Sequence, residues 1–97
     1  MFELQWTDEA KKTYELLKQN PRDIARYRAV KKTIQLLAAN PKHPSLQTHK
    51  FVSLKGPNGE EVFEAYAQQR TSAAYRVFWC YGPLRKQMTI IAITPHP

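Results

Sequence analysis

The sequence contains little cysteine and no long apolar stretch, and both absences exclude whole classes of protein. Because Cys80 is the only cysteine, no disulfide can form within the chain, and its apolar surroundings predict a small core residue. No window approaches the roughly 18 apolar residues of a membrane span. Residues 1–10 are too acidic and too short for a signal peptide, so we expect a cytoplasmic protein.

Sequence motifs for metals and nucleotides are missing as well. The three histidines and the single cysteine lack the spacing of zinc ligands. The three glycines form neither a G-x-G-x-x-G nor a G-x-x-x-x-G-K-[ST] loop, and there is no G-x-S-x-G elbow. We therefore predict a protein without a metal or another cofactor.

Positive charge is what the chain has in excess. Fifteen lysines and arginines stand against eight aspartates and glutamates, which gives a formal net charge of +7 over 97 residues. A basic protein of this size, enough for one domain, favours anionic partners such as nucleic acid, an acidic protein or a membrane surface. Solubility alone would also explain the charge, so composition leaves these alternatives open.

The first part of the chain combines a short strand with two helices. Alternating apolar residues predict a strand at 2–6, and Thr7 is placed to cap the helix that follows. Asn20-Pro21 ends that helix, Asp23 is placed to cap a second one, and Asn40-Pro41 ends the second. The two helices are expected to form an antiparallel pair.

From residue 49 onward the apolar period changes to two, which is typical of β-strands. Turns at KGPNGE and GPLRKQ help to separate the strand candidates, which are residues 49–54, 61–68, 73–81 and 88–94. Helices followed by hairpin-linked strands predict an α+β fold. We expect an N-terminal strand, two antiparallel helices and a mostly antiparallel sheet of about four further strands, with the helices on one face.

Two charged residues stand inside these apolar strands. Glu64 lies in VFEAYA and Arg76 in AYRVFW, so both are expected on the central part of the sheet. They either form a structural ion pair across the strands or belong to a functional patch. The members of such a patch would be Glu64, Arg76 and His96, with Lys50, Lys55 and Arg70 close by in the fold.

A patch of this composition suits cleavage of RNA without a metal. A base removes the proton of a 2′-hydroxyl, whose oxygen then attacks the adjacent phosphorus. Cationic side chains stabilise the extra negative charge of the transition state, and an acid protonates the departing 5′-oxygen. A histidine suits either proton transfer because its ordinary pKa lies close to neutral pH.

The three histidines differ in their surroundings. His96 stands between Pro95 and Pro97, which end the strand ladder, so the sequence predicts either an imidazole fixed at the sheet edge or a frayed tail. His43 and His49 lie in NPKHPSLQTHK, a loop expected to dock the second helix onto the sheet. For these two a structural hydrogen-bonding role is expected.

The order of the elements, together with three longer segments, gives the chain a resemblance to a known family. The segments are LLAANPKHPSLQTHKF, EVFEAYAQQRTSAAYRVFW and TIIAITPHP, which follow the opening strand and WTDEAKKTYELL. In order and spacing they resemble the RelE/ParE superfamily, the toxins of bacterial type II toxin–antitoxin systems. The resemblance covers nearly the whole chain and implies one toxin domain, residues 1–97, whose curved sheet holds an active site on its concave face.

The resemblance also implies an activity and partners. Members of the RelE branch cleave mRNA in the ribosomal A site, so we expect an endoribonuclease that inhibits translation, with mRNA, the ribosome and a cognate antitoxin as partners and no membrane. By position, Arg76 matches the transition-state arginine, His96 a catalytic histidine and Glu64 a carboxylate base. The expected substrate contacts are Lys50, Lys55 and Arg70, and the helix residues expected to suit an antitoxin are Arg22, Arg26 and Lys32.

Two other functions remain open. ParE-like members have the same fold and inhibit DNA gyrase without chemistry of their own, so the fold does not separate them from the nucleases. They generally lack a catalytic constellation, so Arg76 and His96 favour the nuclease. The third alternative is a non-toxic basic module that binds RNA with a steep salt dependence and cleaves nothing.

Overall fold

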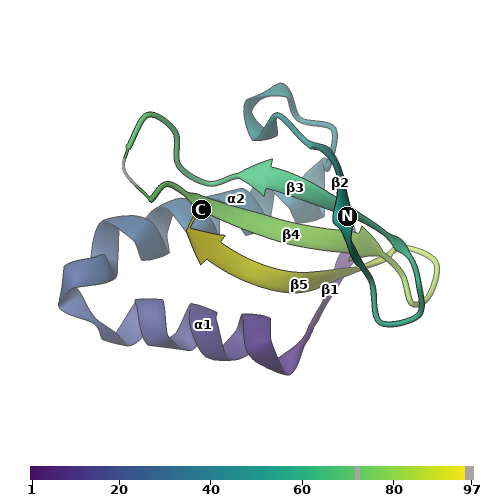
Figure 1. Cartoon of the computed structure of the whole chain (residues 1–97), viewed down its shortest axis with the longest axis horizontal. Coiled ribbons are helices and arrows are strands. Elements are labelled where there is room, and N and C mark those ends of the chain that lie inside the picture. The colour runs from purple at the N-terminus through teal and green to yellow at the C-terminus, as the bar shows by residue number, and fades with distance from the viewer. Residues whose placement is uncertain (72, 96–97) are drawn as a thin grey trace.

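The computed structural model describes residues 1–71 and 73–95, and it shows the α+β fold that the sequence predicted (Figure 1). A strand is followed by two helices and then by four further strands. The elements are β1 (Glu3–Trp6), α1 (Asp8–Gln19), α2 (Ile24–Ala39), β2 (His49–Lys55), β3 (Glu61–Tyr66), β4 (Tyr75–Tyr81) and β5 (Gln87–Pro95), with short 3-10 turns η1 (Pro21–Asp23) and η2 (Pro44–Leu46).

The five strands form one sheet in the order β1-β5-β4-β3-β2. β1 pairs with β5 in parallel and the other three pairings are antiparallel, so the sheet is mostly antiparallel, as predicted. Both helices lie on the same side of the sheet (Figure 1). Within the described ranges, neither helix is both long enough and apolar enough to span a bilayer.

The two helices begin in different ways. The Thr7 hydroxyl accepts a hydrogen bond from the Ala10 N–H at 3.1 Å, as predicted, and donates to the Ile91 carbonyl at 2.7 Å. Asp23 occupies the N-cap position of α2, but its side chain caps no backbone N–H of the described chain, so that prediction is wrong. Its Oδ1 instead accepts from Arg26 Nη1 at 2.9 Å, because a charged guanidinium is a stronger donor than an amide.

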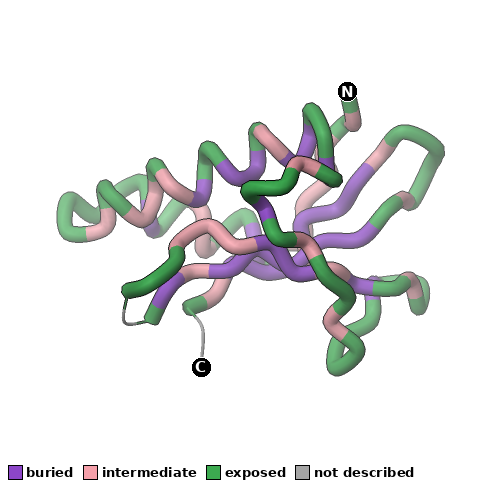
Figure 2. Tube along the Cα trace, turned by 90° about the horizontal axis from the view of Figure 1, so that it is seen from above, coloured by how far each residue is buried: buried purple, intermediate pink, exposed green. Residues whose placement is uncertain are grey.

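Alternation along β3 and β4 divides the sheet into two faces. The face toward the helices, which we call the covered face, contains Ala65, Val77 and Trp79, all within the main apolar core. The opposite side, the open face, has a smaller apolar cluster centred on Val62 and Phe78. Figure 2 shows buried residues running along the central strands while the turns at their ends are exposed. The covered face therefore supplies most of the apolar burial that stabilises the fold.

Candidate functional site

Four polar side chains meet on the open face, and together we call them the charged cluster: His49, Glu64, Tyr66 and Arg76. They come from three neighbouring strands, β2, β3 and β4. In the register of the sheet His49 is opposite Glu64, and Tyr66 is opposite Arg76. Because cross-strand partners point to the same side of a sheet, the register brings all four together.

Glu64 is the centre of the cluster, and each of its oxygens faces a different basic side chain. Oε1 lies 2.7 Å from His49 Nε2, and Oε2 lies 3.8 Å from Arg76 Nε. Glu64 and Arg76 are only 7 % and 9 % exposed. Burying a lone carboxylate or guanidinium is costly, so these charges are tolerated because they are paired. The structure thus brings together two of the three predicted catalytic residues.

Arg76 is held in a fixed orientation by its own surroundings. Its Nη1 donates to the carbonyl oxygens of Gln68 at 3.3 Å and Ala74 at 3.2 Å. The guanidinium lies over the Tyr66 ring, 4.0 Å from the ring centroid, which adds a cation–π attraction. Among the described residues its Nε has no hydrogen-bond partner, since the Glu64 oxygen is too distant for one. A donor is therefore left over at the centre of the site.

His49 also belongs to the cluster, although the sequence analysis expected only a structural hydrogen-bonding role for it. It is the first residue of β2, its side chain is 46 % exposed, and its ring meets Tyr66 edge-on at 5.6 Å. Its Nδ1 lies 3.1 Å from the Gln47 carbonyl oxygen. The sequence did include His49 in a strand candidate, but nothing in it reveals which residue of β3 lies opposite.

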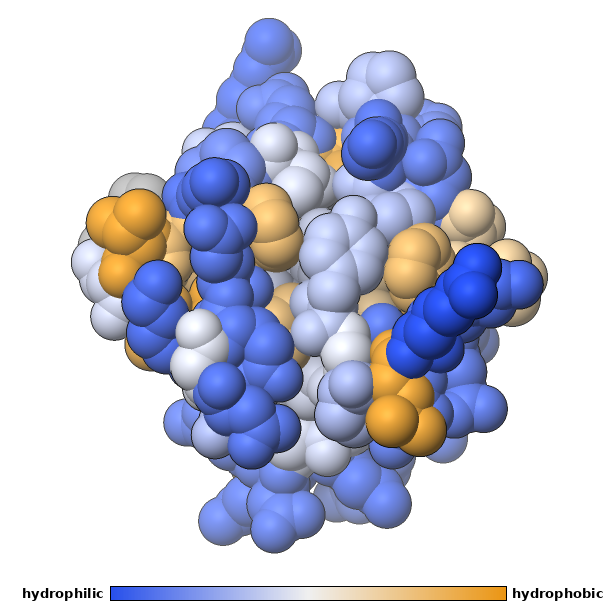
Figure 3. Space-filling view, turned by 90° about the vertical axis from the view of Figure 1, so that its right-hand side faces the viewer, coloured by the Kyte–Doolittle hydropathy of each residue, from blue (hydrophilic) through white to orange (hydrophobic). Residues whose placement is uncertain are grey.

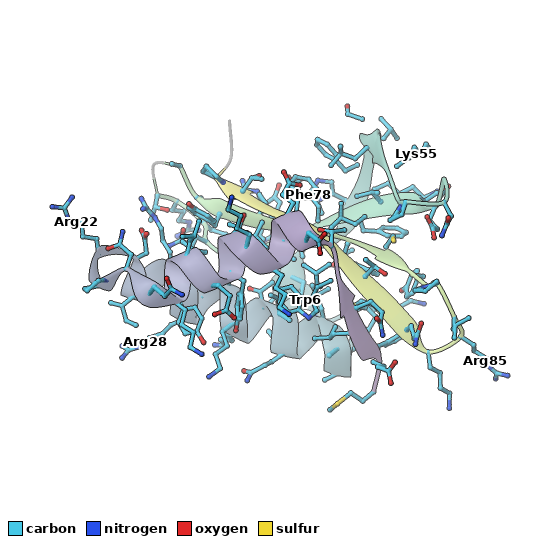
Figure 4. The ribbon with its side chains drawn as sticks, turned by 90° about the horizontal axis from the view of Figure 1, so that it is seen from below. Trp6, Arg22, Arg28, Lys55, Phe78 and Arg85 are labelled. Atoms are coloured by element: carbon cyan, nitrogen blue, oxygen red, sulfur yellow. The ribbon has the colours of Figure 1, made fainter. Side chains whose placement is uncertain are left out.

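The remaining predicted residues are spread more widely. Lys50 pairs in register with Phe63, which is on the covered side, and its Nζ lies 3.5 Å from the Glu61 carboxylate. Lys55 ends β2, at the hairpin away from Phe78 (Figure 4). Arg70 is exposed in the β3–β4 connection, with a positive φ of 60°. The predicted role of each in substrate binding remains a prediction, and His96 lies outside the described residues.

Cys80 is buried on the open-face side of β4, because it alternates with Trp79 and Tyr81 along the strand. Burial raises the pKa of its thiol, and the negative charge of Glu60 raises it further. A protonated, buried thiol is a poor nucleophile, which agrees with the core role predicted for this residue. Among the described residues, no group of three or more histidine, cysteine, aspartate or glutamate side chains could hold a metal ion.

A separate hollow of about 570 Å³ lies on the covered side, next to the loop that precedes β2. Its lining combines the aromatic rings of Phe63, Trp79 and Tyr81 with residues 41–44. Among the described residues that line it there is no carboxylate, so it lacks the paired acid and base groups of the charged cluster. Figure 3 looks onto the end of the molecule where the hairpin turns lie, and hydrophilic residues cover most of it.

No protein-family model and no curated protein sequence matches this chain. Solved structures do match it over nearly its whole length. A YoeB/ParE toxin from Agrobacterium tumefaciens has a TM-score of 0.69 at 16 % identity, covering 99 % of this chain and 100 % of that one.

Two similar structures are complexes. One is the RelE–RelB complex from the archaeon Pyrococcus horikoshii, with a TM-score of 0.65 at 19 % identity over 97 % of this chain and 93 % of that one. The other is the YoeB–YefM complex from Staphylococcus aureus, with a TM-score of 0.67 at 11 % identity over 100 % and 99 %. At these identities the likeness establishes architecture. This chain has the fold of the RelE/ParE superfamily toxins.

Proposed function

We propose that the chain is the toxin of a type II toxin–antitoxin pair and inhibits translation by cleaving mRNA on the ribosome without a metal. The observation that carries this proposal is the buried Glu64–Arg76 pair on the open face. An apolar pair at these two positions would commonly be as stable or more so, and paired charges with an unused donor are typical of functional sites. The toxin fold adds support.

The geometry supports a separate role for each of the two residues. Arg76 would stabilise the phosphate under attack, because its positive charge suits the negative charge that develops there. Glu64 Oε2 makes no short hydrogen bond to Arg76, so it is the oxygen that would accept the proton of the 2′-hydroxyl. This keeps the predicted transition-state and base roles.

The test compares Arg76→Ala with Arg85→Ala, a matched control. Arg85 is exposed in the β4–β5 turn and points away from the body of the protein (Figure 4). Each variant and the wild type are expressed under tight control, and growth and mapped mRNA 5′-ends are recorded. We expect arrest with cuts at regular codon positions for the wild type and Arg85→Ala, and about 100-fold fewer cuts for Arg76→Ala.

Three other results would overturn either the role of the charged cluster or the nuclease itself. Full cleavage by Arg76→Ala, at normal protein levels, would remove the charged cluster from the chemistry. Arrest with DNA damage and intact mRNA would indicate a ParE-like gyrase inhibitor. Absence of arrest, together with salt-dependent RNA binding by the purified protein, would indicate a basic RNA-binding module.

A toxin of this kind requires an antitoxin, and we propose that an acidic segment of that protein binds the basic helix surface. The YoeB and RelE structures from S. aureus and P. horikoshii are complexes with YefM and RelB. Arg26 is engaged by Asp23 and lies over Tyr75 at 5.5 Å, so the exposed Arg22 and Lys32 are better placed for a partner. Reversing both charges to glutamate should weaken co-purification with the antitoxin, whereas Arg85→Glu should not.

A further inference from the structure

His49 belongs to the charged cluster, but the roles proposed for Glu64 and Arg76 leave it without a function. We infer that His49 is the general acid of the reaction, which gives its Nδ1 proton to the departing 5′-oxygen of RNA. This inference rests on the proposed function, because it assigns one step of that cleavage. It is carried by the two contacts of the ring, by its exposure and by its position next to Glu64 and Arg76.

The contacts of the ring determine how many protons it holds. Nδ1 faces the Gln47 carbonyl oxygen at 3.1 Å, and a carbonyl can only accept, so Nδ1 carries a proton. Nε2 lies 2.7 Å from Glu64 Oε1, which requires a second proton between the two atoms. If that proton is on nitrogen, the ring is an imidazolium, and if it is on oxygen, Glu64 is neutral.

Arg76 decides between these two states. Its guanidinium lies beside the other oxygen of Glu64, at 3.8 Å, and a nearby positive charge favours the ionised carboxylate. The second proton therefore belongs to His49 Nε2, and the ring is an imidazolium. The carboxylate separates the two cations and stabilises both. A doubly protonated histidine is the state that a general acid needs before the reaction.

Of His49 and Glu64, the histidine is the more exposed and therefore the more accessible to a leaving group. The side chain of Glu64 is 9 % exposed, and that of His49 is 46 % exposed. Among the described residues, Nδ1 contacts a backbone carbonyl at the surface, so an RNA oxygen can take the place of that acceptor. In the part of the chain that the structure describes, the titratable and charged groups that face the ring are Glu64 and Tyr66 from β3 and, across them, Arg76 from β4.

The step balances with the role proposed for Glu64. The bond between phosphorus and the 5′-oxygen breaks, its electron pair goes to that oxygen, and the oxygen takes the proton from His49 Nδ1. At the same time the 2′-oxygen forms its bond to phosphorus after losing its proton to Glu64. His49 loses one proton and Glu64 gains one, so the pair ends with the number it had, and exchange through the exposed ring restores the starting state.

The test uses ribosomes programmed with a short mRNA and compares His49→Gln with His43→Gln. Glutamine keeps a hydrogen-bonding side chain but cannot serve as an acid near neutral pH. His43 is a matched control, because it hydrogen-bonds within the loop before β2, to Ser45 at 2.7 Å. We expect the single-turnover rate of His49→Gln to fall by about 10²–10⁴-fold and that of His43→Gln to stay within about threefold of the wild type.

A second substrate separates an acid from a merely structural residue. In it the departing 5′-oxygen is replaced by sulfur, and a thiolate leaves without being protonated, since thiols have a pKa near 8.5. His49→Gln should then cleave within about tenfold of the wild-type rate, because the general-acid contribution of about 10²–10⁴-fold is no longer needed.

The outcomes distinguish this inference from the proposed function. If the wild type does not cleave the oxygen substrate, the proposed function fails, and if Arg76→Ala and His49→Gln both cleave it normally, the roles of these two residues are overturned while the cleavage stands. Two results would overturn only the role of His49 as the acid, provided that Arg76→Ala is inactive. In the first, His49→Gln is fully active; in the second, His49→Gln is slow with both the oxygen and the sulfur substrate. Rescue of His96→Gln by sulfur, without rescue of His49→Gln, would likewise overturn it and assign the acid to His96. Equal thermal unfolding of the variants excludes misfolding as the cause.

Discussion

The covered and open faces of the sheet are built from the same strands and differ in what they bury. Along β4, Val77 and Trp79 point into the main core, and between and beside them Arg76 and Phe78 point to the open side. Trp79 is 1 % exposed among apolar neighbours, whereas Arg76 is 9 % exposed beside a carboxylate. Adjacent residues of one strand thus belong to the apolar core on one face and to the charged cluster on the other.

This difference shows how a small protein can carry a buried charged site. The helices cover only one face, so most of the apolar burial that stabilises the molecule comes from that face and not from the open face. The open face can then hold Glu64 and Arg76, which contribute little net stability because the cost of desolvation offsets their attraction. Substitutions on the two faces should separate these contributions.

The largest expected effect on stability is on the covered face. Replacing Trp79 by alanine should lower the free energy of unfolding by about 3–5 kcal/mol, because it leaves a cavity and removes the ring stacked on Phe63 at 4.9 Å. Urea unfolding followed by circular dichroism measures this change. Leu84→Ala, at an exposed turn position, should shift it by less than about 0.5 kcal/mol. Equal losses in both variants would show that the covered face is not the main core.

A smaller loss is expected when one charge of the open face is left without its partner. Glu64→Gln should lower the free energy of unfolding by about 1–3 kcal/mol, because Arg76 stays buried without a counter-charge. Adding Arg76→Met to this variant should recover part of the loss, since no buried charge remains. The same urea experiment measures both. A double variant less stable than Glu64→Gln would contradict the idea that an unpaired charge causes the loss.

The ion pair of Lys50 and Glu61 is the opposite case, because both side chains are exposed to solvent. Lys50 contacts Glu61 at 3.5 Å, and the two side chains are 63 % and 59 % exposed. Lys50→Ala should change the free energy of unfolding by less than about 1 kcal/mol, because solvent and salt screen such a pair. Unfolding at low and high salt should bring the variant and the wild type together. A loss as large as that of Glu64→Gln would be inconsistent with an exposed pair.

The smallest effect concerns the pH dependence of stability at Cys80. Burial raises the pKa of this thiol in the folded protein above the ordinary value of 9.0, so the unfolded chain ionises first as pH rises. The contribution of the protonated Cys80 thiol to the free energy of unfolding is unchanged below about pH 9, and it is lost as pH increases through the folded pKa. The free energy of unfolding of the wild type should therefore fall more between pH 8 and pH 10 than that of Cys80→Ala. Parallel slopes would show that the thiol is not shielded.

The sequence by itself determined the fold class and which residues of each strand share a face of the sheet. The change of apolar period at residue 49, the breaks at Asn20-Pro21 and Asn40-Pro41 and the Thr7 cap are local signals, and local signals are enough to place helices and strands. The alternation of apolar residues along AYRVFW also puts Arg76 and Val77 on opposite faces of the sheet, as they lie in the structure. The Asp23 cap failed because a guanidinium one turn away competes for the carboxylate.

Only the tertiary structure decided which side chains meet. The pairing of β2 with β3 contains an irregularity between Lys50 and Lys55, and no local pattern reveals its register. That register brings His49 to Glu64 and directs Lys50 to the other side, because neighbouring residues of a strand face opposite ways. Long-range pairing therefore gave Glu64 its second partner, which is a property of two strands brought together and not of either segment alone.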